Sequence, residues 1–552
     1  MSDYNLSELN KAIKLQSNNQ LDMAEKIYEQ ILTRDGKDFN ALYLLGTIKA
    51  QKNKNDEAVF LIKKSLSIYP NNFIAYSNLG LIYYNINKLE EAIIEFNKSI
   101  LVNSIYSESY NGLGSVYLKQ KKYLLAFKNY KKSVRINKHF LSGYLNIVKL
   151  LVELQKYERA ELILDKLLII DPNNYENYYI KGIINKRLGK FELSKESYLK
   201  SIELNPDHHL SYNEIGYLFY LNKDFKNAYF YMDKSIAINE SFKEGFLNRG
   251  ILNLLTEKFV EGWKDYCIGK ETAYPRTGKP LWDGQVNLKN KSIFIYSEQG
   301  LGDVIQFTRY LFVLKNHFNK IIYKIPSSLK YLFSNINNCM DNKIELVTDF
   351  EKVDECDFHL PLFNLGLFFN EIPIEIDYLN INKELVSMWS KKFNNKNYNI
   401  GICWRAGKKT DLYKSEFSAE RSFELDQLSK IMSLNKVELI NLQKEHEEDQ
   451  KKIYYDKITI FKEMDLVQPF LDTAAIIMNC NLIITCDTSI AHLAGTMGKK
   501  TFLLLNYNND WRWGVDKDYC SWYKTVKLFR QTASKSWNEP FNQVYDNIKT
   551  LL

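Results

Sequence analysis

Several acidic, basic and hydroxyl residues of this chain stand where an apolar run gives way to a helical pattern. In NLIITCDTSIAHLAGTMGKKTFLLLN (481–506), Asp487, Thr488 and Ser489 separate a strand-like run from a short helix. Free backbone N–H groups and hydroxyls at a helix N-terminus suit an anion such as a phosphate. Asp487 can orient the hydroxyls or nearby arginines, or contact a sugar hydroxyl. His492 lies four residues after Thr488 on the same helical face, where it can serve the anion or simply pack.

A basic loop follows another strand-like run. Arg405 comes directly after the run YNIGICW, and Lys408, Lys409 and Arg421 follow before the next helical pattern. A loop that carries cations and ends at a helix N-terminus predicts a phosphate site, because positive charge and backbone N–H groups converge there. The alternative is a solvated basic loop, the usual place of surface lysines.

The stretch SEQGLGDVIQF (297–307) has two interpretations. Gly300 and Gly302 surround a strand-to-helix turn, and Asp303 stands at the start of the helix. The carboxylate can cap the free N–H groups of that helix, with the glycines serving a tight turn. It can also be exposed at the mouth of a cleft, where it would act on a ligand.

Aromatic residues crowd the segment after the last strand-like run. Trp511 and Trp513 can stack on a sugar or a base, or can cover a core. Asp516 and Asp518 form the D-x-D pair that some metal-dependent sugar transferases use, but no strand-like run positions them. We therefore predict no metal site.

These residues are carried by alternating strands and helices in the second half of the chain. Apolar runs and amphipathic segments alternate in two series, over 291–396 and 397–552. This alternation predicts parallel sheets covered by helices on both faces, here as two Rossmann-like lobes. A ligand is expected at the carboxyl ends of the strands, in the cleft between the lobes.

The first half, residues 5–272, repeats with a period of 34 residues. One register of small residues holds Gly46, Gly80, Gly114, Gly182, Gly216 and Gly250. In one unit Val148 takes the place of this glycine. Twelve residues after each of these positions stands a second small residue: Ala58, Ala92, Ala126, Ala160, Ser194, Ala228 and Gly262. Small residues on both helices of a hairpin let the helices approach closely, so we predict about eight helical hairpins stacked as a solenoid. The period resembles that of the tetratricopeptide repeat family, whose arrays bind peptides or partner proteins. Residues 273–290 carry prolines and glycines and read as a connector.

Composition excludes some classes of function. The net charge of +8 is mild for 552 residues and evenly spread, which argues against nucleic-acid binding and is compatible with an anionic ligand. The seven cysteines are scattered without a C-x-x-C pair, as expected of free thiols in a reducing compartment. We find no signal peptide and no run of 18 apolar residues, so we predict no membrane span and a cytoplasmic location.

Ordered motifs of the second half resemble a known family. They are EQGLGDVIQFTRY, CWRAG, NLQK, DTAAII, CDTSIAHLAGTMGKKT, DWRWG and KLFRQ. They are similar to the catalytic domain of bacterial tetratricopeptide-repeat glycosyltransferases, which is itself similar to the heptosyltransferases of lipopolysaccharide synthesis. That resemblance implies a GT-B arrangement of the two lobes.

The resemblance also implies roles for individual residues. Asp303, after Gly302 in the GD turn, takes the place of the general base. The turn of Asp487, Thr488, Ser489 and His492 takes the place of the donor diphosphate site. Arg421 takes the place of the basic phosphate contact, although ERSFEL departs from the Lys-Arg-Trp-Pro-like sequence usual in heptosyltransferases. Arg405 matches only the repeat-bearing subgroup, Lys408 is its basic neighbour, and Gln443 is placed near the nucleotide because it follows a strand.

The leading hypothesis is therefore a glycosyltransferase. It would move a sugar from a nucleotide sugar to an acceptor hydroxyl, with inversion and without a metal or other cofactor, while the repeats recruit the acceptor or a partner protein. Two alternatives stay open: a binding scaffold with a dormant transferase fold, and an interaction protein that uses only its repeats.

Overall fold

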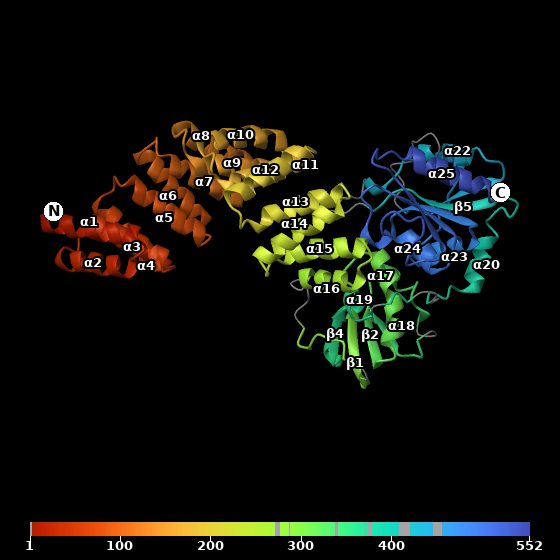
Figure 1. Ribbon diagram of the computed structural model, residues 1–552. Coiled ribbons are helices and arrows are strands. Elements are labelled where there is room, and N and C mark those ends of the chain that lie inside the picture. The colour runs from red at the N-terminus through yellow and green to blue at the C-terminus, as the bar shows by residue number, and fades with distance from the viewer. Residues whose placement is uncertain are drawn as a thin grey trace. The chain divides into compact units, whose positions relative to one another are not determined.

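The protein is described by a computed structural model. The described residues are 3–270, 277–285, 288–336, 340–369, 371–373, 378–407, 420–444 and 455–552. The chain divides into two compact units, one ending at Leu218 and one running from Phe219 to Leu552 (Figure 1). In the described part of the chain, no helix is both long enough and apolar enough to cross a membrane.

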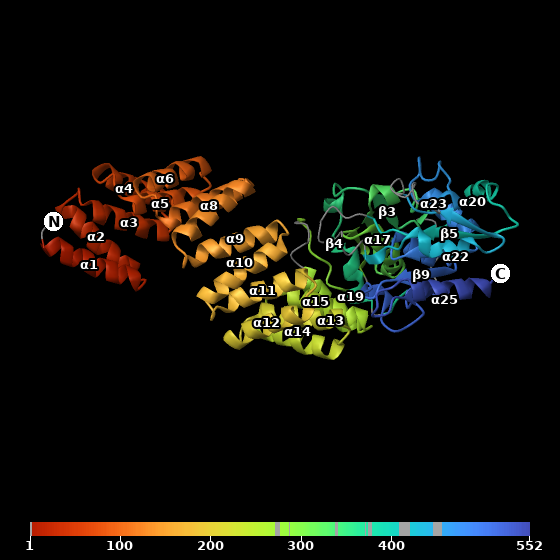
Figure 2. The same ribbon diagram turned by 90° about the horizontal axis from the view of Figure 1, so that it is seen from above.

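Sixteen consecutive helices form a solenoid, as predicted. They are α1 (Asp3–Ser17), α2 (Leu21–Arg34), α3 (Phe39–Gln51), α4 (Asn55–Ile68), α5 (Phe73–Asn85), α6 (Leu89–Val102), α7 (Ser107–Lys119), α8 (Tyr123–Ile136), α9 (Leu141–Glu153), α10 (Tyr157–Ile170), α11 (Tyr175–Arg187), α12 (Phe191–Leu204), α13 (His209–Leu221), α14 (Phe225–Ile238), α15 (Lys243–Leu255) and α16 (Phe259–Lys270). Within the first unit, successive helices lie side by side in chain order (Figures 1 and 2).

The small residues of the repeat lie where paired helices touch. A Cβ added to Gly114 on α7 would stand 2.5 Å from the ring of Tyr130 on α8, closer than carbon atoms can approach. Ala126, twelve residues after Gly114, is completely buried. The turns within pairs repeat as well, with Asn53 and Asn87 both in the left-handed region at φ +60° and +64°. The 34-residue period is therefore a repeated close contact between neighbouring helices.

The last repeat helices belong to the second unit. Trp263 on α16 is 2% exposed and packs edge-on against Phe307, Phe363 and Trp511 of the α/β region. Glu257, in the turn between α15 and α16, pairs with Lys517. The repeat pattern ends near residue 272, whereas the compact unit begins at Phe219, because α14–α16 share a core with the lobes.

Two parallel sheets form the rest of the second unit. The first lobe has strand order β3-β2-β1-β4, from β1 (Leu288–Tyr296), β2 (Phe318–Lys324), β3 (Ile344–Val347) and β4 (Phe358–Pro361), with α17 (Leu301–Phe307), α18 (Leu311–Leu314) and α19 (Leu365–Phe368). The second lobe has order β10-β9-β8-β5-β6-β7, from β5 (Tyr398–Cys403), β6 (Val437–Asn441), β7 (Ile458–Thr459), β8 (Leu482–Cys486), β9 (Thr501–Leu505) and β10 (Val526–Arg530). Its helices are α20 (Lys383–Ser390), α22 (Ser429–Met432), α23 (Leu471–Asn479), α24 (Ser489–Thr496) and α25 (Asn538–Lys549). All pairings within the named strands are parallel, so the predicted α/β class is confirmed.

Helices cover both faces of the second sheet. Ile402 and Ile484 pack with Val544 of α25, whereas Cys403 and Ile483 pack with residues of α23 and α24. The helix α20 precedes the predicted start of the second lobe at 397, yet it packs on α23, where Trp389 Nε1 donates to Asp472 Oδ1 at 3.0 Å.

Some elements differ from the sequence-based expectation. The amphipathic helix expected after residue 300 ends as α17 at Phe307, and a 3-10 turn precedes the short α18. Near this transition the Thr308 hydroxyl donates to the Val304 carbonyl, and Arg309 Nε donates to the Gln306 carbonyl. The helical pattern that follows Arg421 in the sequence is likewise a 3-10 turn, Leu425–Leu428, followed by α22.

Candidate functional site

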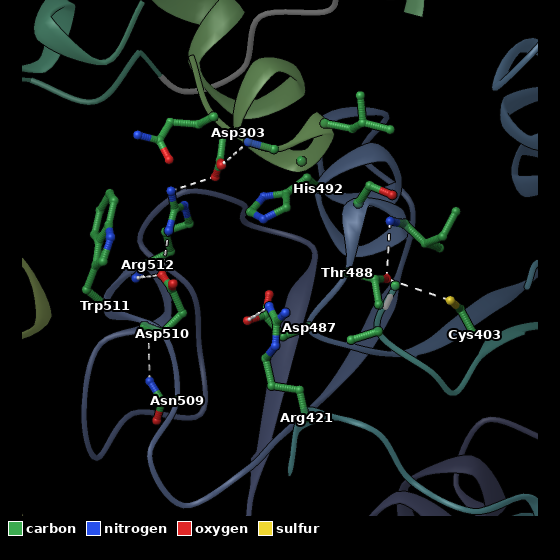
Figure 3. A pocket seen from close by; sticks show the side chains of 18 of the residues that line it. Asp303, Cys403, Arg421, Asp487, Thr488, His492, Asn509, Asp510, Trp511 and Arg512 are labelled. Carbon is green, nitrogen blue, oxygen red and sulfur yellow. Dashed lines mark hydrogen bonds and ion pairs between the residues drawn. The ribbon is translucent and has the colours of Figure 1, made fainter. Parts of the chain in front are cut away.

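A cavity of about 900 Å³ lies in the second unit, between the carboxyl ends of both sheets and the last repeat helices (Figure 3). The predicted site residues that line it are Gly302, Asp303, Arg405, Arg421, Gln443, Asp487, Thr488, Ser489, His492 and Trp511. Trp513 does not line it, and Lys408 lies outside the described residues. Residues chosen from turns up to about 200 positions apart thus surround one space.

Asp303 caps its own helix and also lines the cavity. The backbone N–H of Gly300 donates to Asp303 Oδ2 at 2.8 Å, which satisfies a free donor at the start of α17. Asp303 Oδ1 lies 2.5 Å from Arg512 Nη2. Burial raises the pKa of the Asp303 carboxyl, and the Arg512 guanidinium opposes that rise.

Gly302 lets the two lobes approach at this point. A Cβ on Gly302 would lie 2.6 Å from Cδ2 of His492 on α24. The His492 ring has little freedom to give way, because its Nδ1 lies 3.0 Å from the Tyr523 hydroxyl and the ring stacks on Trp513. The close packing of α17 on α24 therefore depends on glycine and brings Asp303 beside the second lobe.

His492 is a neutral side chain in this setting. Burial, assisted by nearby Arg512, lowers the pKa of His492 to about 3. The ring lines the cavity, but it brings no positive charge to an anion at neutral pH. Its contacts match the packing interpretation of the sequence.

The Thr488 turn presents a helix N-terminus to the cavity. Thr488 is the N-cap of α24, and its hydroxyl accepts from the backbone N–H of Ile490 at 3.3 Å. The same hydroxyl lies 3.1 Å from Thr485 Oγ1 and 3.7 Å from Cys403 Sγ. Backbone N–H groups at such a position favour negative charge.

Arg421 is held at this turn by Asp487. Arg421 Nη1 lies 3.3 Å from Asp487 Oδ2, and the Asp487 side chain is 8% exposed (Figure 3). Burial raises the pKa of Asp487, and Arg421 opposes the rise. Of the roles that the sequence allowed for Asp487, orienting an arginine fits this contact.

Gln443 fixes the backbone at the start of the basic loop. Its side-chain oxygen accepts from the backbone N–H of Arg405 at 3.0 Å and from Cys403 Sγ at 3.3 Å. Its own backbone is fixed by Asn441, which exchanges two hydrogen bonds with it. Gln443 thus joins the ends of β5 and β6 and sets the backbone at Arg405.

The tryptophans are largely core residues. Trp511 is 6% exposed and packs edge-on against Trp263 and Trp522. Trp513 is 2% exposed and stacks on His492. These contacts leave little ring surface for a sugar and favour the core interpretation.

Sequence reasoning missed two charged residues at the centre of the cavity. Asp510 and Arg512 line it and lie 2.6 Å apart, from Arg512 Nη1 to Asp510 Oδ1. The sequence contained a signal for them, because DWRWG follows the end of β9 as the Thr488 turn follows β8. The tryptophans of this motif suggested ring stacking instead of a charged site.

Residues of the repeat array that line the cavity were also missed. They are Tyr220, Leu247, Ile251, Tyr266 and Lys270. Tyr266 on α16 accepts from Gln299 Nε2 at 3.3 Å, close to the Asp303 turn. A repeat period does not reveal which of its units docks on another domain, so no sequence signal pointed to these lining residues.

The charges on the lining favour an anion. Among the described residues, five cationic side chains and three carboxylates line the cavity: Lys270, Arg405, Arg421, Lys444 and Arg512 against Asp303, Asp487 and Asp510. Lys444 is also paired with Asp465 at 2.9 Å. In the described part of the chain, no cluster of three or more His, Cys, Asp or Glu side chains is arranged to hold a metal ion.

Comparison with known proteins confirms the tetratricopeptide repeats. One sequence model of this repeat matches residues 39–72, 107–140 and 175–208, and a second model of the repeat matches residues 61–94. All four segments lie in the helical array. Such arrays typically serve protein interaction. No curated protein matches the chain.

Solved structures with similar folds include YrrB, described as a TPR protein with an unusual peptide-binding site. It is 21% identical over 32% of this chain and 92% of YrrB, with a TM-score of 0.29. PilF of Pseudomonas aeruginosa is 19% identical over 38% of this chain and 94% of its own, with a TM-score of 0.34. The C-terminal part of a TPR protein from Cytophaga hutchinsonii is 17% identical over 44% and 98%, with a TM-score of 0.37.

Proposed function

We propose that the chain is a glycosyltransferase that moves a sugar from a nucleotide-sugar donor to an acceptor hydroxyl. One observation carries the proposal: a partly buried carboxylate of the first lobe, Asp303, and an anion-compatible turn of the second lobe, at Thr488, line the same cavity. The cavity volume of about 900 Å³ falls in the range of ligand sites.

The second lobe would hold the donor diphosphate. Backbone N–H groups at the start of α24 and the guanidinium of Arg421 would bind its oxygens, with Arg405 at the neighbouring strand end. These groups would stabilise the charge that builds on the leaving diphosphate as the glycosidic bond breaks. Because cationic side chains supply this stabilisation, the proposal contains no metal-dependent step.

Asp303 would act as the general base. A free carboxylate has a pKa near 4 and is a weak base, but burial raises the pKa of Asp303 and so strengthens it. It would accept the proton of the acceptor hydroxyl late in the reaction, which contributes on the order of 10²–10⁴-fold to the rate. Attack on the face opposite the leaving group would invert the configuration at the sugar carbon.

The repeats would present the acceptor. Leu247 and Ile251 on α15 and Tyr266 on α16 line the same cavity as Asp303. An acceptor bound by the array would therefore also contact the last two helices of the array, α15 and α16, inside the cavity. A protein or peptide acceptor suits this arrangement, because tetratricopeptide arrays commonly bind such partners.

Donor binding tests the proposal. ADP-, UDP- and GDP-sugars would be screened by thermal shift, since a ligand that binds only the folded state raises the melting temperature. We expect one nucleotide class to stabilise the second unit. Arg421→Ala should weaken that binding at least about tenfold, the loss of one charge-assisted hydrogen bond.

A matched control is Asp426→Asn, an exposed position of the second lobe that does not line the cavity. It should bind the donor as the wild type does. Absence of binding by every nucleotide sugar would contradict the proposal and would favour an interaction protein that uses only its repeats. Binding without any turnover would favour the second candidate, a scaffold with a dormant transferase fold.

A further inference from the structure

Arg512 has a polar partner at each of the three nitrogens of its side chain. Its Nη2 lies 2.5 Å from Asp303 Oδ1, its Nη1 lies 2.6 Å from Asp510 Oδ1, and its Nε donates to Gln306 Oε1 at 3.1 Å. Figure 3 shows the guanidinium between the two carboxylates. All three edges of the planar group thus have polar partners.

The position of Arg512 is fixed by its surroundings. Its guanidinium lies 4.4 Å from the ring centre of Trp511 and 5.4 Å from that of Phe363. Asp510 also accepts from the backbone N–H of Arg512 at 3.1 Å, which locks the short 3-10 turn that carries the residue. The side chain is only 10% exposed. A cation held this firmly needs no reorganisation when a reaction begins.

Arg512 also connects the two lobes. Asp303 and Gln306 lie on α17 of the first lobe, whereas Asp510 and Arg512 follow β9 of the second lobe. A lysine could not reproduce these contacts, because an ammonium group is a point charge without the planar fork of a guanidinium.

We propose that Arg512 is a positioning residue that keeps the Asp303 carboxylate ionised and turned into the cavity. The inference rests on the proposed function, in which Asp303 is the general base. Arg512 acts through Asp303 and is not itself assigned a contact with substrate.

The charged and titratable groups around Asp303 come from several elements. They are Arg512 and Asp510 after β9, Asp487 after β8, Glu298 after β1, Tyr266 on α16 and His492 on α24. The two nearby aspartates disfavour ionisation of Asp303, and Arg512 favours it. Loss of Arg512 would therefore raise the pKa of Asp303 further, and activity would be lost at a higher pH on the acid side.

The test is the pH profile of transfer by Arg512→Ala. The acid limb of this profile is the pH range in which activity falls as Asp303 becomes protonated. We expect it to move to higher pH by about one to three units, the usual influence of a neighbouring guanidinium on the pKa of an aspartate. We expect kcat at neutral pH to fall as well, because less Asp303 is ionised and the carboxylate is no longer held towards the cavity. Arg512→Lys should keep the limb near its original pH, since the charge remains, and should lose only part of the rate.

Two controls separate positioning from general damage. Asp510→Asn removes a carboxylate that opposes ionisation of Asp303, so its acid limb should stay or move down, opposite to that of Arg512→Ala. Arg530→Lys loosens the same segment, which Arg530 holds through Asn509 Oδ1 at 2.7 Å and the Lys517 carbonyl at 3.0 Å. It should lower the melting temperature without moving the acid limb.

An acid limb that Arg512→Ala leaves in place would overturn the inference. If the wild type turns over no donor, the proposed function fails, and the titration of the Asp303 carboxyl then decides the inference alone. That titration is read by carbon-13 NMR of labelled aspartate, with Asp303→Asn identifying the signal. A shift to higher pH in Arg512→Ala supports the inference, and an unmoved titration refutes it.

Discussion

The helical array of the first unit and the cavity of the second unit are built from contacts of very different sequence range. In the array, Asn146 Nδ2 donates to Asn111 Oδ1 across 35 positions, and Ser194 donates to the Gly182 carbonyl across 12. In the second unit, Arg512 reaches Gln306 across 206 positions, and Arg309 reaches the Trp522 carbonyl across 213. A local defect in the array should therefore leave its other repeats folded. The cavity, in contrast, depends on elements that come together only when the whole unit is folded.

The largest effect is expected from truncating an aromatic ring where the array and the lobes share a core. Trp263→Ala should destabilise the second unit by about 3–5 kcal/mol, because the ring packs between Phe307 and Trp511. Donor binding should be lost as well, because the cavity and its proposed donor site belong to the destabilised unit. Region-resolved hydrogen exchange and calorimetric donor titration would measure both effects.

The matched truncation in the first unit is Tyr198→Ala, at a residue that is also fully buried. It should open the helices around α12 to exchange and leave donor affinity unchanged. If Tyr198→Ala also abolished donor binding, or Trp263→Ala spared it, the distinction between a local array and a long-range site would fail.

A smaller effect is expected from adding one methyl group at a close contact in each region. Gly302→Ala would push the ring of His492 away from α17, and Gly114→Ala would push Tyr130 away from α7. Each should cost about 1–3 kcal/mol of stability. Only Gly302→Ala should also lower kcat, because it displaces Asp303 from the second lobe. Equal effects of the two variants on kcat would contradict this account.

The smallest effect is expected at the ion pair that joins the last repeat turn to the second lobe. Glu257 pairs with Lys517 and accepts from the Ser521 hydroxyl at 2.7 Å. Burial opposes ionisation of Glu257, but these partners outweigh it and lower its pKa. Glu257→Gln should therefore cost at most about 1 kcal/mol at pH 7.

The sign of the pH dependence follows from the lowered pKa of Glu257. Its contribution is present above the ordinary value of 4.5 and is lost as the pH falls through the lower folded-state value. The difference in melting temperature between wild type and Glu257→Gln should shrink below pH 4.5. A difference that persisted unchanged at pH 3 would show that the ion pair is not its cause.

The same contrast in sequence range explains what the sequence could predict. Sixteen helices followed from one 34-residue period, since each small residue contacts its own hairpin partner. The strands β1, β2, β4, β5, β6, β8 and β9 followed from apolar runs. The strands β3, β7 and β10 were missed because they are short or partly polar, as in VKLFR of β10.

The sequence could predict the site only through the rule that ligands bind at the carboxyl ends of parallel strands. That rule placed Asp303, Arg405, Arg421 and the Thr488 turn around one space. It could not show that Asp487 would turn to Arg421, or that Trp511 would be buried under Trp263. It could have found Asp510 and Arg512, which also follow a strand.

The most direct test of the central claim is transfer and donor binding by Asp303→Asn, measured on the same preparation. An asparagine keeps the size and the acceptor oxygen that cap α17, but it cannot take the proton of an acceptor hydroxyl. We predict that donor affinity stays within about threefold of wild type and that kcat falls at least about 100-fold. Wild-type turnover in this variant would contradict the account.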